Sequence, residues 1–262
     1  MPELRGSLLW YELMTTDVDA AKVFYEPVVG WTFGDAAPEF NGYRMINRSD
    51  GGFAGGVLPI TDDMQQHGAR PGWLSYIGVD DVDSAVAAIE QAGGKAWMPP
   101  TDIPNVGRVA LVTDPQAAPF YVMKPIPPQG NPDAQSDVFS PDGGLGRCGW
   151  NELLTTDVDA ARRFYKEQFG WDSDESMDMG QFGEYRFFHR AGTRIGALFN
   201  PQTGAPGKWR FYFRVPSITA SKETAEKAGA TVTNGPHQVP GGDWIITGTD
   251  PQGAEFALVG GE

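Results

Sequence analysis

The sequence predicts an α+β protein of two tandem domains, each built from two copies of one strand-and-helix module. Residues 10–31 return as residues 150–171, at an offset of 140, with 14 of 22 positions identical. An offset this long is typical of a duplicated domain and not of a solenoid repeat. A shorter echo lies inside the first domain, where residues 17–21 return as residues 81–85. We therefore expect four equivalent modules, each with a strand, a helix and three further strands.

The opening of each domain predicts a strand followed by a capped helix. Residues alternate between two faces from Trp10 to Met14, as they do in a β-strand. Thr16 is placed as the helix N-cap, ahead of a first turn in which the helix dipole favours the aspartates present there. Gly30 is placed as the C-terminal cap. Five residues follow at helical spacing, namely Val18, Ala21, Phe24, Tyr25 and Val28. We expect them in the core, together with Phe164 and Tyr165, the counterparts of Phe24 and Tyr25 in the second copy.

Turn signals and a restart of the opening pattern divide the rest of the first domain. A second helix is expected over residues 82–92, with Asp80 and Asp81 at its start and a glycine pair at its end. Residues 59–72 are rich in loop-forming side chains, and we expect a loop there. The expected strands cover residues 43–48, 53–58, 73–79, 96–98, 108–112 and 119–123.

Residues 124–146 lack periodicity and are dense in Pro and Gly, which is typical of a semi-extended interdomain linker. Beyond them, the second half of the first domain returns at an offset of 136, with Trp209 for Trp73 and Tyr212 for Tyr76. We place the domains at residues 1–124 and 146–262, with the linker over residues 125–145.

Charge and composition limit the expected partners. The formal net charge is −14, and a strongly acidic surface repels phosphate backbones and anionic lipid. We therefore expect a small-molecule ligand, no nucleic acid and no membrane partner. Met1 is not followed by a basic, apolar leader or by about 18 consecutive apolar residues, which favours a cytoplasmic protein. The single cysteine, Cys148, is expected to be a small buried hydrophobe in preference to a reactive thiol.

The motif set resembles the vicinal oxygen chelate superfamily, which includes glyoxalase I, bleomycin-resistance proteins and extradiol dioxygenases. The shared features are a strand, a Thr-Asp that opens a helix with Ala-x-x-Phe-Tyr, a closing Gly-Trp, and Asp-Pro-x-Gly before the last strand. The resemblance covers residues 6–124 and 146–260 and is nearest to two-domain bacterial glyoxalase-like proteins. It implies paired βαβββ modules whose curved sheets enclose a cleft.

The resemblance also implies where metal ligands would lie, and these positions lack metal-binding side chains. The first-strand His or Gln is replaced by Trp10 and Trp150, and the second-module His by Leu74 and Arg210. The closing Glu is replaced by Tyr121 and Ala257. An open metal site needs about three nitrogen or oxygen ligands from the protein. We therefore expect no metal and no cofactor.

The three histidines do not restore a metal site. His67 lies in a loop, His189 on a strand opposite the position of Asn47 in the first copy, and His237 after a Gly-Pro pair. Because these places are not equivalent, each histidine is expected to be solvated or structural and not a ligand.

Strand alternation places one carboxylate in each expected cleft. Glu12 shares a strand face with Trp10, and Glu152 shares one with Trp150. A carboxylate beside a Trp can act as a general base or receive a cation. Alternatively, each glutamate accepts hydrogen bonds from neighbouring groups and anchors the sheet. The residues expected on the same inner faces are Tyr76 and Tyr121 in the first copy, and Arg210, Tyr212 and Arg214 in the second.

Two functions fit this lining. The first is metal-independent binding of a small planar or aromatic organic molecule, of the drug- or metabolite-binding or resistance type. The alternative is a glyoxalase-like lyase or isomerase, or an accessory biosynthetic enzyme, that uses Glu12 or Glu152 in acid–base catalysis. The duplicated plan fits a monomer with an internal pseudo-dimer, or a homodimer.

Overall fold

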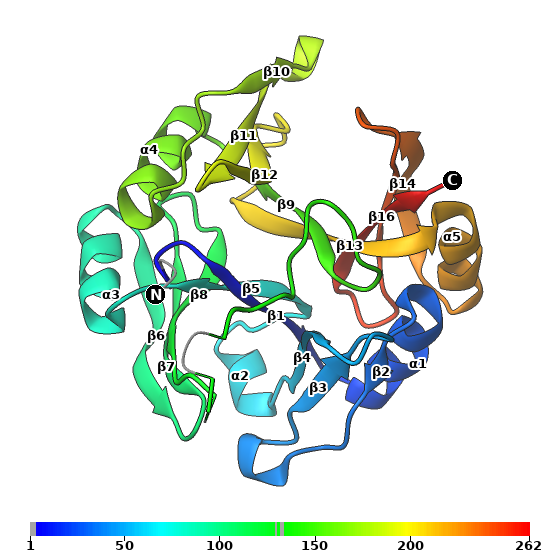
Figure 1. Ribbon diagram of the computed structural model, residues 1–262, viewed down its shortest axis with the longest axis horizontal. Coiled ribbons are helices and arrows are strands. Elements are labelled where there is room, and N and C mark those ends of the chain that lie inside the picture. The colour runs from blue at the N-terminus through cyan, green and yellow to red at the C-terminus, as the bar shows by residue number, and fades with distance from the viewer. Residues whose placement is uncertain (1–3, 129, 132–133) are drawn as a thin grey trace. The chain divides into compact units, whose positions relative to one another are not determined.

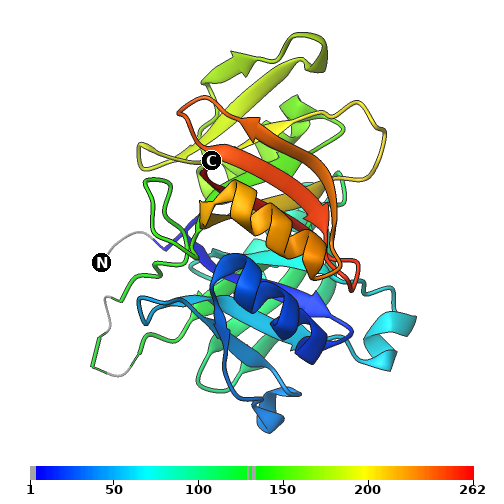
Figure 2. The same cartoon turned by 90° about the vertical axis from the view of Figure 1, so that its right-hand side faces the viewer.

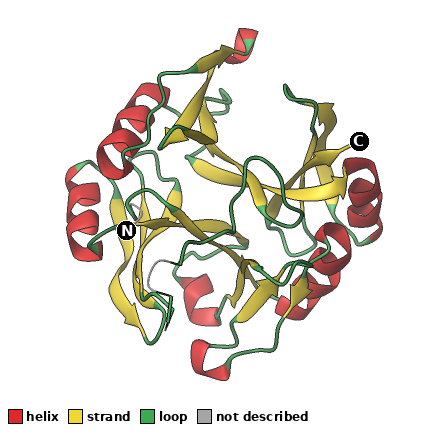
Figure 3. Ribbon diagram, viewed as in Figure 1, coloured by secondary structure: helices red, strands yellow, loops and turns green. Residues whose placement is uncertain are grey.

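Four modules of strand, helix and three strands follow one another along the chain in a computed structural model (Figures 1 and 3). The structure describes residues 4–128, 130–131 and 134–262, so the extreme start and part of the expected linker lie outside it. The first module contains β1 (Leu8–Thr15), α1 (Val18–Val29), β2 (Thr32–Phe33), β3 (Arg44–Asn47) and β4 (Phe53–Pro59). The second contains β5 (Gly72–Gly78), α3 (Val82–Gln91), β6 (Lys95–Ile103), β7 (Gly107–Thr113) and β8 (Pro119–Pro125).

The second pair of modules repeats this order. The third module contains β9 (Cys148–Leu154), α4 (Val158–Phe169), β10 (Ser176–Asp178), β11 (Glu184–Arg190) and β12 (Thr193–Phe199). The fourth contains β13 (Lys208–Ser217), α5 (Ile218–Lys227), β14 (Thr231–Gln238), β15 (Trp244–Thr249) and β16 (Glu255–Gly261). Short helical turns are α2 (Asp62–Gln66), η1 (Pro38–Phe40) and η2 (Gly180–Phe182). No helix of the described residues is both long enough and apolar enough to cross a membrane.

The strands form two mixed eight-stranded sheets, and the expected α+β class is confirmed. Their strand orders are β2-β3-β4-β1-β5-β8-β7-β6 and β10-β11-β12-β9-β13-β16-β15-β14. Within each module the first strand pairs in parallel with the last, as Glu12 does with Gly56 and Glu152 with Ala197. A parallel pair cannot be joined by a tight hairpin, and in each module a helix and two strands connect the two partners.

Two local expectations are wrong. Asp17, and not Thr16, caps α1: the backbone stays extended through Asp17, whose carboxylate accepts from the Ala20 amide at 2.9 Å. Residues 59–72 are not all loop, because Thr61 caps the short helix α2 and accepts from the Met64 amide. The C-cap expectation is confirmed, since Gly30 adopts a left-handed φ of 84°.

The chain divides into two compact units that combine modules far apart in sequence. The 2–3 unit contains residues 1–9, 75–136 and 151–209, and the 1–4 unit contains residues 10–74, 137–150 and 210–262. In the 1–4 unit α1 lies beside α5 (Figures 1 and 2), and in the 2–3 unit α3 contacts α4. Four of the five unit boundaries fall inside β1, β5, β9 and β13, and the fifth lies between Ser136 and Asp137 in the expected linker. The domain limits placed at residues 124 and 146 remain a prediction.

A buried Trp–Tyr–Asp chain of hydrogen bonds connects the two modules of the 1–4 unit. Trp73 Nε1 donates to Tyr25 Oη at 3.1 Å, and Tyr25 Oη donates to Asp250 Oδ2 at 3.0 Å. The other carboxylate oxygen of Asp250 accepts from the amides of Gln252 and Ala254. One carboxylate oxygen of Asp250 therefore accepts from the amides of its own Asp-Pro-Gln turn, and the other accepts from the tyrosine hydroxyl of α1.

The 2–3 unit repeats the same chain of hydrogen bonds. Trp209 Nε1 donates to Tyr165 Oη, and Tyr165 Oη donates to Asp114 Oδ2, both at 3.2 Å. Burial raises the pKa of the Asp114 carboxyl to about 6. Both tyrosines are fully buried, and their helix neighbours Phe24 and Phe164 are almost so. Ala21 and Val28 are also buried, so these expected core residues are confirmed, whereas Val18 is only half-buried.

A described part of the expected linker is held by ion pairs within the 1–4 unit. Asp137 Oδ2 accepts from Arg48 Nη2 at 2.6 Å and from Arg147 Nη2 at 2.8 Å. Asp50 also pairs with both arginines. The Arg48 guanidinium is buried, so these two carboxylates compensate a charge that water cannot reach.

Candidate ligand-binding faces

The first strand of the first module has one face in the core of its unit and one face turned away. Tyr11 and Leu13 are fully buried, and the Tyr11 ring centre lies 5.1 Å from that of Phe211. Trp10 and Glu12 alternate with them and therefore lie on the opposite face.

Trp10 is held on this face by a tyrosine that the sequence reasoning did not single out. Its Nε1 donates to Tyr43 Oη at 2.7 Å, and its ring centre lies 5.9 Å from that of Phe53. The register places Gly56 beside Glu12, and a Cβ at Gly56 would lie 1.9 Å from Tyr43 Oη. The absence of a side chain at Gly56 is therefore what allows the Tyr43 hydroxyl to reach Trp10.

The equivalent tyrosine of the third module binds the expected catalytic glutamate. Tyr185 Oη donates to Glu152 Oε1 at 2.9 Å, and Glu152 is only 6% exposed. The rings of Phe187 and Phe199 lie 5.7 and 5.6 Å from the Tyr185 ring. The signal available in the sequence was the tyrosine at or near the start of the third strand of both modules, Tyr43 and Tyr185.

The second module brings its two expected ligand-binding tyrosines together. Tyr76 and Tyr121 are register partners on the parallel strands β5 and β8. Their rings stack with centres 4.2 Å apart and an interplanar angle of 15°. Tyr76 is 8% exposed and Tyr121 5%, so only the edges of this stack are accessible.

The fourth module contains the two arginines that were expected in the lining, and carboxylates pair with both. Arg210 Nε lies 2.6 Å from Glu255 Oε1, and Arg214 Nη1 lies 2.9 Å from Asp243 Oδ2. Tyr212 forms a buried cluster with Ala257 and Val259, and Trp150 packs against this cluster. Of the expected site residues, the 1–4 unit holds Trp10, Glu12, Trp150, Arg210, Tyr212 and Arg214, and the 2–3 unit holds Glu152, Tyr76 and Tyr121.

Cys148 is buried, as expected, and two of the histidines lie on the surface. Cys148 is fully buried, and burial raises the pKa of its thiol to about 12. The His67 side chain is exposed directly after α2, and its Nδ1 lies 2.8 Å from the Asp63 carbonyl oxygen. His237 is exposed and bonds to Asn234.

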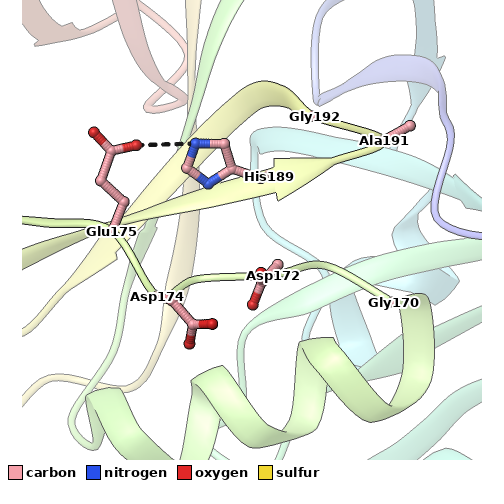
Figure 4. Close-up of a pocket in the computed structure, with 7 residues that line it drawn as sticks. All are labelled: Gly170, Asp172, Asp174, Glu175, His189, Ala191 and Gly192. Carbon is pink, nitrogen blue, oxygen red and sulfur yellow. Dashed lines mark ion pairs between the residues drawn. The ribbon is translucent and has the colours of Figure 1, made fainter.

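His189 instead lies in a pocket of about 410 Å³ within the 2–3 unit (Figure 4). The pocket is lined by Gly170, Asp172, Asp174, Glu175, His189, Ala191 and Gly192. His189 Nε2 lies 3.1 Å from Glu175 Oε2. Sequence reasoning missed this pocket because its walls come from the α4–β10 connection and the β11–β12 turn, which share no motif.

The side chains at the positions implied by the resemblance do not fit a metal ion. Trp10, Leu74 and Ala257 have no imidazole or carboxylate to offer, and Arg210 is itself a cation. Among the described residues, no group of three or more His, Cys, Asp or Glu side chains is arranged to hold a metal. Chemistry that depends on a metal at these positions therefore has no suitable ligands.

Comparison with known proteins gives matches along nearly the whole chain. The profile of the Glyoxalase/Bleomycin resistance protein/Dioxygenase superfamily matches residues 7–118 and 144–258. The putative glyoxylase CFP32 of Mycobacterium tuberculosis is 32% identical over 97% of this chain and 95% of its own. The anthracycline biosynthesis protein DauV of Streptomyces is 31% identical, covering 97% and 93%. The Mn(II)-bound glyoxalase of Novosphingobium aromaticivorans has a similar fold, with a TM-score of 0.64, 18% identity and coverage of 98% and 82%.

Proposed function

Because the chain belongs to the glyoxalase, bleomycin resistance protein and dioxygenase superfamily, we propose that it binds a small planar or aromatic organic molecule without a metal ion. The observation that carries the proposal is the Tyr76–Tyr121 stack, with Tyr121 at the position of the closing metal-binding Glu. At this position the metal-dependent relatives of the superfamily use a side chain that coordinates a metal, whereas this chain has a pair of stacked rings. Stacked rings bind through ring contacts, which favour flat, apolar molecules.

Further support comes from the first and third modules. Trp10 and Tyr43 form a hydrogen-bonded aromatic pair in one, and Tyr185, Phe187 and Phe199 form a ring cluster in the other. Two similar proteins are named for anthracycline biosynthesis, and anthracyclines are built on a fused, planar ring system. A ligand with several fused rings therefore suits both the lining and the relatives.

The test is a titration with the uncharged aglycone of an anthracycline, followed by the fluorescence of the ligand. We expect saturable binding that survives treatment with EDTA. Tyr121→Leu should weaken it roughly tenfold, because it removes one ring of the stack. Trp97→Leu is the matched control, since Trp97 is an aromatic side chain of the same unit that is 59% exposed outside the stack.

Tyr76→Phe keeps the ring and loses only the hydroxyl, so it guards against a folding defect in the leucine variant. We expect its affinity to stay within about threefold of the wild type. The proposal fails if no saturable binding is found, or if chelation abolishes binding and a divalent metal restores it.

The alternative is an enzyme of the glyoxalase-like lyase or isomerase type, or an accessory biosynthetic enzyme. The observation in its favour is that buried Glu152 accepts a hydrogen bond from Tyr185, which fixes the carboxylate in one orientation. Turnover of a hemithioacetal substrate that is lost in Glu152→Gln or Glu12→Gln, with ligand binding retained, would establish this alternative. Equal loss of binding and turnover would instead assign the glutamates to ligand binding.

A further inference from the structure

We infer that the ligand binds to one copy of the duplicated strand face, the face of the first module that carries Trp10, and not to its counterpart in the third module. We call this face the first-module shelf and define it by Trp10, Tyr43, Met45, Phe53 and Gly56. All five residues belong to the 1–4 unit. The inference rests on the proposed function and deepens it, because it assigns the uncharged ring system to one face and predicts one ligand per chain.

The first-module shelf exposes large apolar side chains that lie next to one another on β3, β4 and β1 (Figure 1). Phe53 is 43% exposed and Met45 is 36% exposed. The Phe53 ring centre lies 5.9 Å from that of Trp10. Met45 and Glu12 are both register partners of Gly56, so Met45 shares the face on which Trp10 lies. Single exposed apolar residues are common, whereas a contiguous exposed apolar surface marks an interaction site.

The aromatic floor of the shelf is ordered by contacts within the first module. Trp10 Nε1 donates to Tyr43 Oη at 2.7 Å, so the indole is held in one orientation. The Tyr43 ring lies directly over the backbone of Gly56, where any side chain would overlap it. Because these rings are already ordered, a flat ligand can pack on them with little further loss of side-chain entropy.

The corresponding face of the third module is covered by the chain itself. The strand register places Phe187 at the position of Met45, and Arg194 at the position of Phe53. The Arg194 guanidinium lies 4.4 Å above the Phe187 ring centre, and its Nε donates to Glu175 Oε2 at 3.1 Å. An apolar ring could reach Phe187 only by displacing this ion-paired guanidinium. The two copies of the face are therefore not equivalent as ligand sites.

The charges around the first-module shelf favour a ligand without a negative charge. Glu12 lies beside Gly56 on this face, so an anionic group would meet a carboxyl group there. Arg44 alternates to the opposite face of β3, where it pairs with Asp19 at 2.9 Å. The shelf thus suits a flat, uncharged ring system.

The test locates the bound ligand by methionine oxidation. Full-length protein is treated with dilute hydrogen peroxide, with and without a saturating concentration of the uncharged anthracycline aglycone. Sulfoxide formation at each methionine is followed by peptide mass spectrometry, because oxidation depends on exposure. We expect the aglycone to slow the oxidation of Met45 at least threefold. Met64, on α2 of the same unit, should oxidise at an unchanged rate.

Two variants with the same chemical change compare the two copies of the face. Phe53→Leu should weaken aglycone binding about tenfold, because it removes an exposed ring of the shelf. Phe187→Leu removes a ring of the third-module face and should leave the affinity and the ratio of one ligand per chain unchanged.

Two further variants test the effect of charge. Phe53→Arg copies the third module and should weaken binding about thirtyfold, because it places a cation on the apolar shelf. Val23→Arg makes the same change of charge at an exposed apolar residue of α1 in the same unit, and it should leave the affinity unchanged.

The outcomes separate this inference from the proposed function. Saturable binding without protection of Met45, or equal effects of the two leucine variants, would overturn the inference and leave the proposed function intact. Two bound aglycones per chain would also overturn it. Binding that weakens in Phe53→Leu but not in Tyr121→Leu would support the shelf and remove the tyrosine stack from the site. Without saturable binding, both proposals fail.

Discussion

The Tyr165 hydroxyl donates to the Asp114 carboxylate across 3.2 Å, and these residues belong to different modules of the 2–3 unit. Asp114 is 1% exposed, so its charge is held away from water. Tyr25 and Asp250 repeat the contact in the 1–4 unit. Each helix tyrosine is thus connected to the turn that precedes the last strand of a distant module.

Stability should fall with rising pH because of Asp114. The folded-state pKa of its carboxyl is about 6, above the ordinary value of 3.8. The stabilisation is therefore fully present below about pH 4 and is lost as the pH rises through 6. Between pH 4 and pH 7.5, the unfolding free energy of the wild type should fall by about 1–3 kcal/mol more than that of Asp114→Asn. Urea unfolding at both pH values measures this. Equal changes of unfolding free energy in the wild type and in Asp114→Asn would contradict the assignment.

Loss of the Tyr165 hydroxyl should destabilise the fold. Tyr165→Phe leaves the Asp114 carboxylate and the Trp209 indole N–H without their shared partner in a buried site. We expect a cost of about 1–3 kcal/mol in unfolding free energy at pH 7. Combined with Asp114→Asn in a double-mutant cycle, the two effects should not be additive. Additive effects would show that the pair is not coupled.

Gly56→Ala should release Trp10 from Tyr43. The added Cβ would overlap the Tyr43 hydroxyl, so the ring must move and the Trp10–Tyr43 hydrogen bond must break. We expect a destabilisation of about 1–3 kcal/mol and a changed tryptophan emission spectrum. The same change should cost less stability in a Tyr43→Ala background, because the added Cβ would also lie 2.2 Å from Cζ and 2.5 Å from Cε1 of the Tyr43 ring. An equal cost in both backgrounds would place the clash elsewhere.

The thiol of Cys148 should resist alkylation in the folded protein. Burial holds its pKa near 12, so the reactive thiolate is scarce at pH 8. Iodoacetamide should label it at least a hundredfold more slowly in buffer than in 6 M guanidinium chloride, as followed by mass spectrometry. Equal rates would mean that β9 opens readily.

The repeated modules, the helix cores and the cap at Gly30 could be predicted from sequence because each depends on local spacing. Thr16 and Asp17 are both good caps, and only the backbone path decides between them. The short helix within residues 59–72 was not expected, because Pro59 and Gly68 flank the segment in which Thr61 can still start one turn.

The contacts between modules could not be predicted, because they depend on which modules pack together. Tyr25 shows its helical spacing in the sequence, but nothing there identifies Asp250 as its partner. Glu12 and Glu152 could be placed on a strand face by alternation. The different hydrogen-bonding roles of Tyr43 and Tyr185 arise only from the register of each sheet.

The interleaved composition of the two units has a consequence for biosynthesis on the ribosome. The 1–4 unit needs residues 210–262 to join residues 10–74, which the ribosome makes well before them. The 2–3 unit needs residues up to 209, including Trp171, whose indole donates to the Gly6 carbonyl at 2.9 Å. Neither unit can close while only the first two modules have emerged. Phe24 and Phe120, which pack against Phe256 and Phe169, are therefore still uncovered at a stage when exposed apolar segments are prone to aggregate.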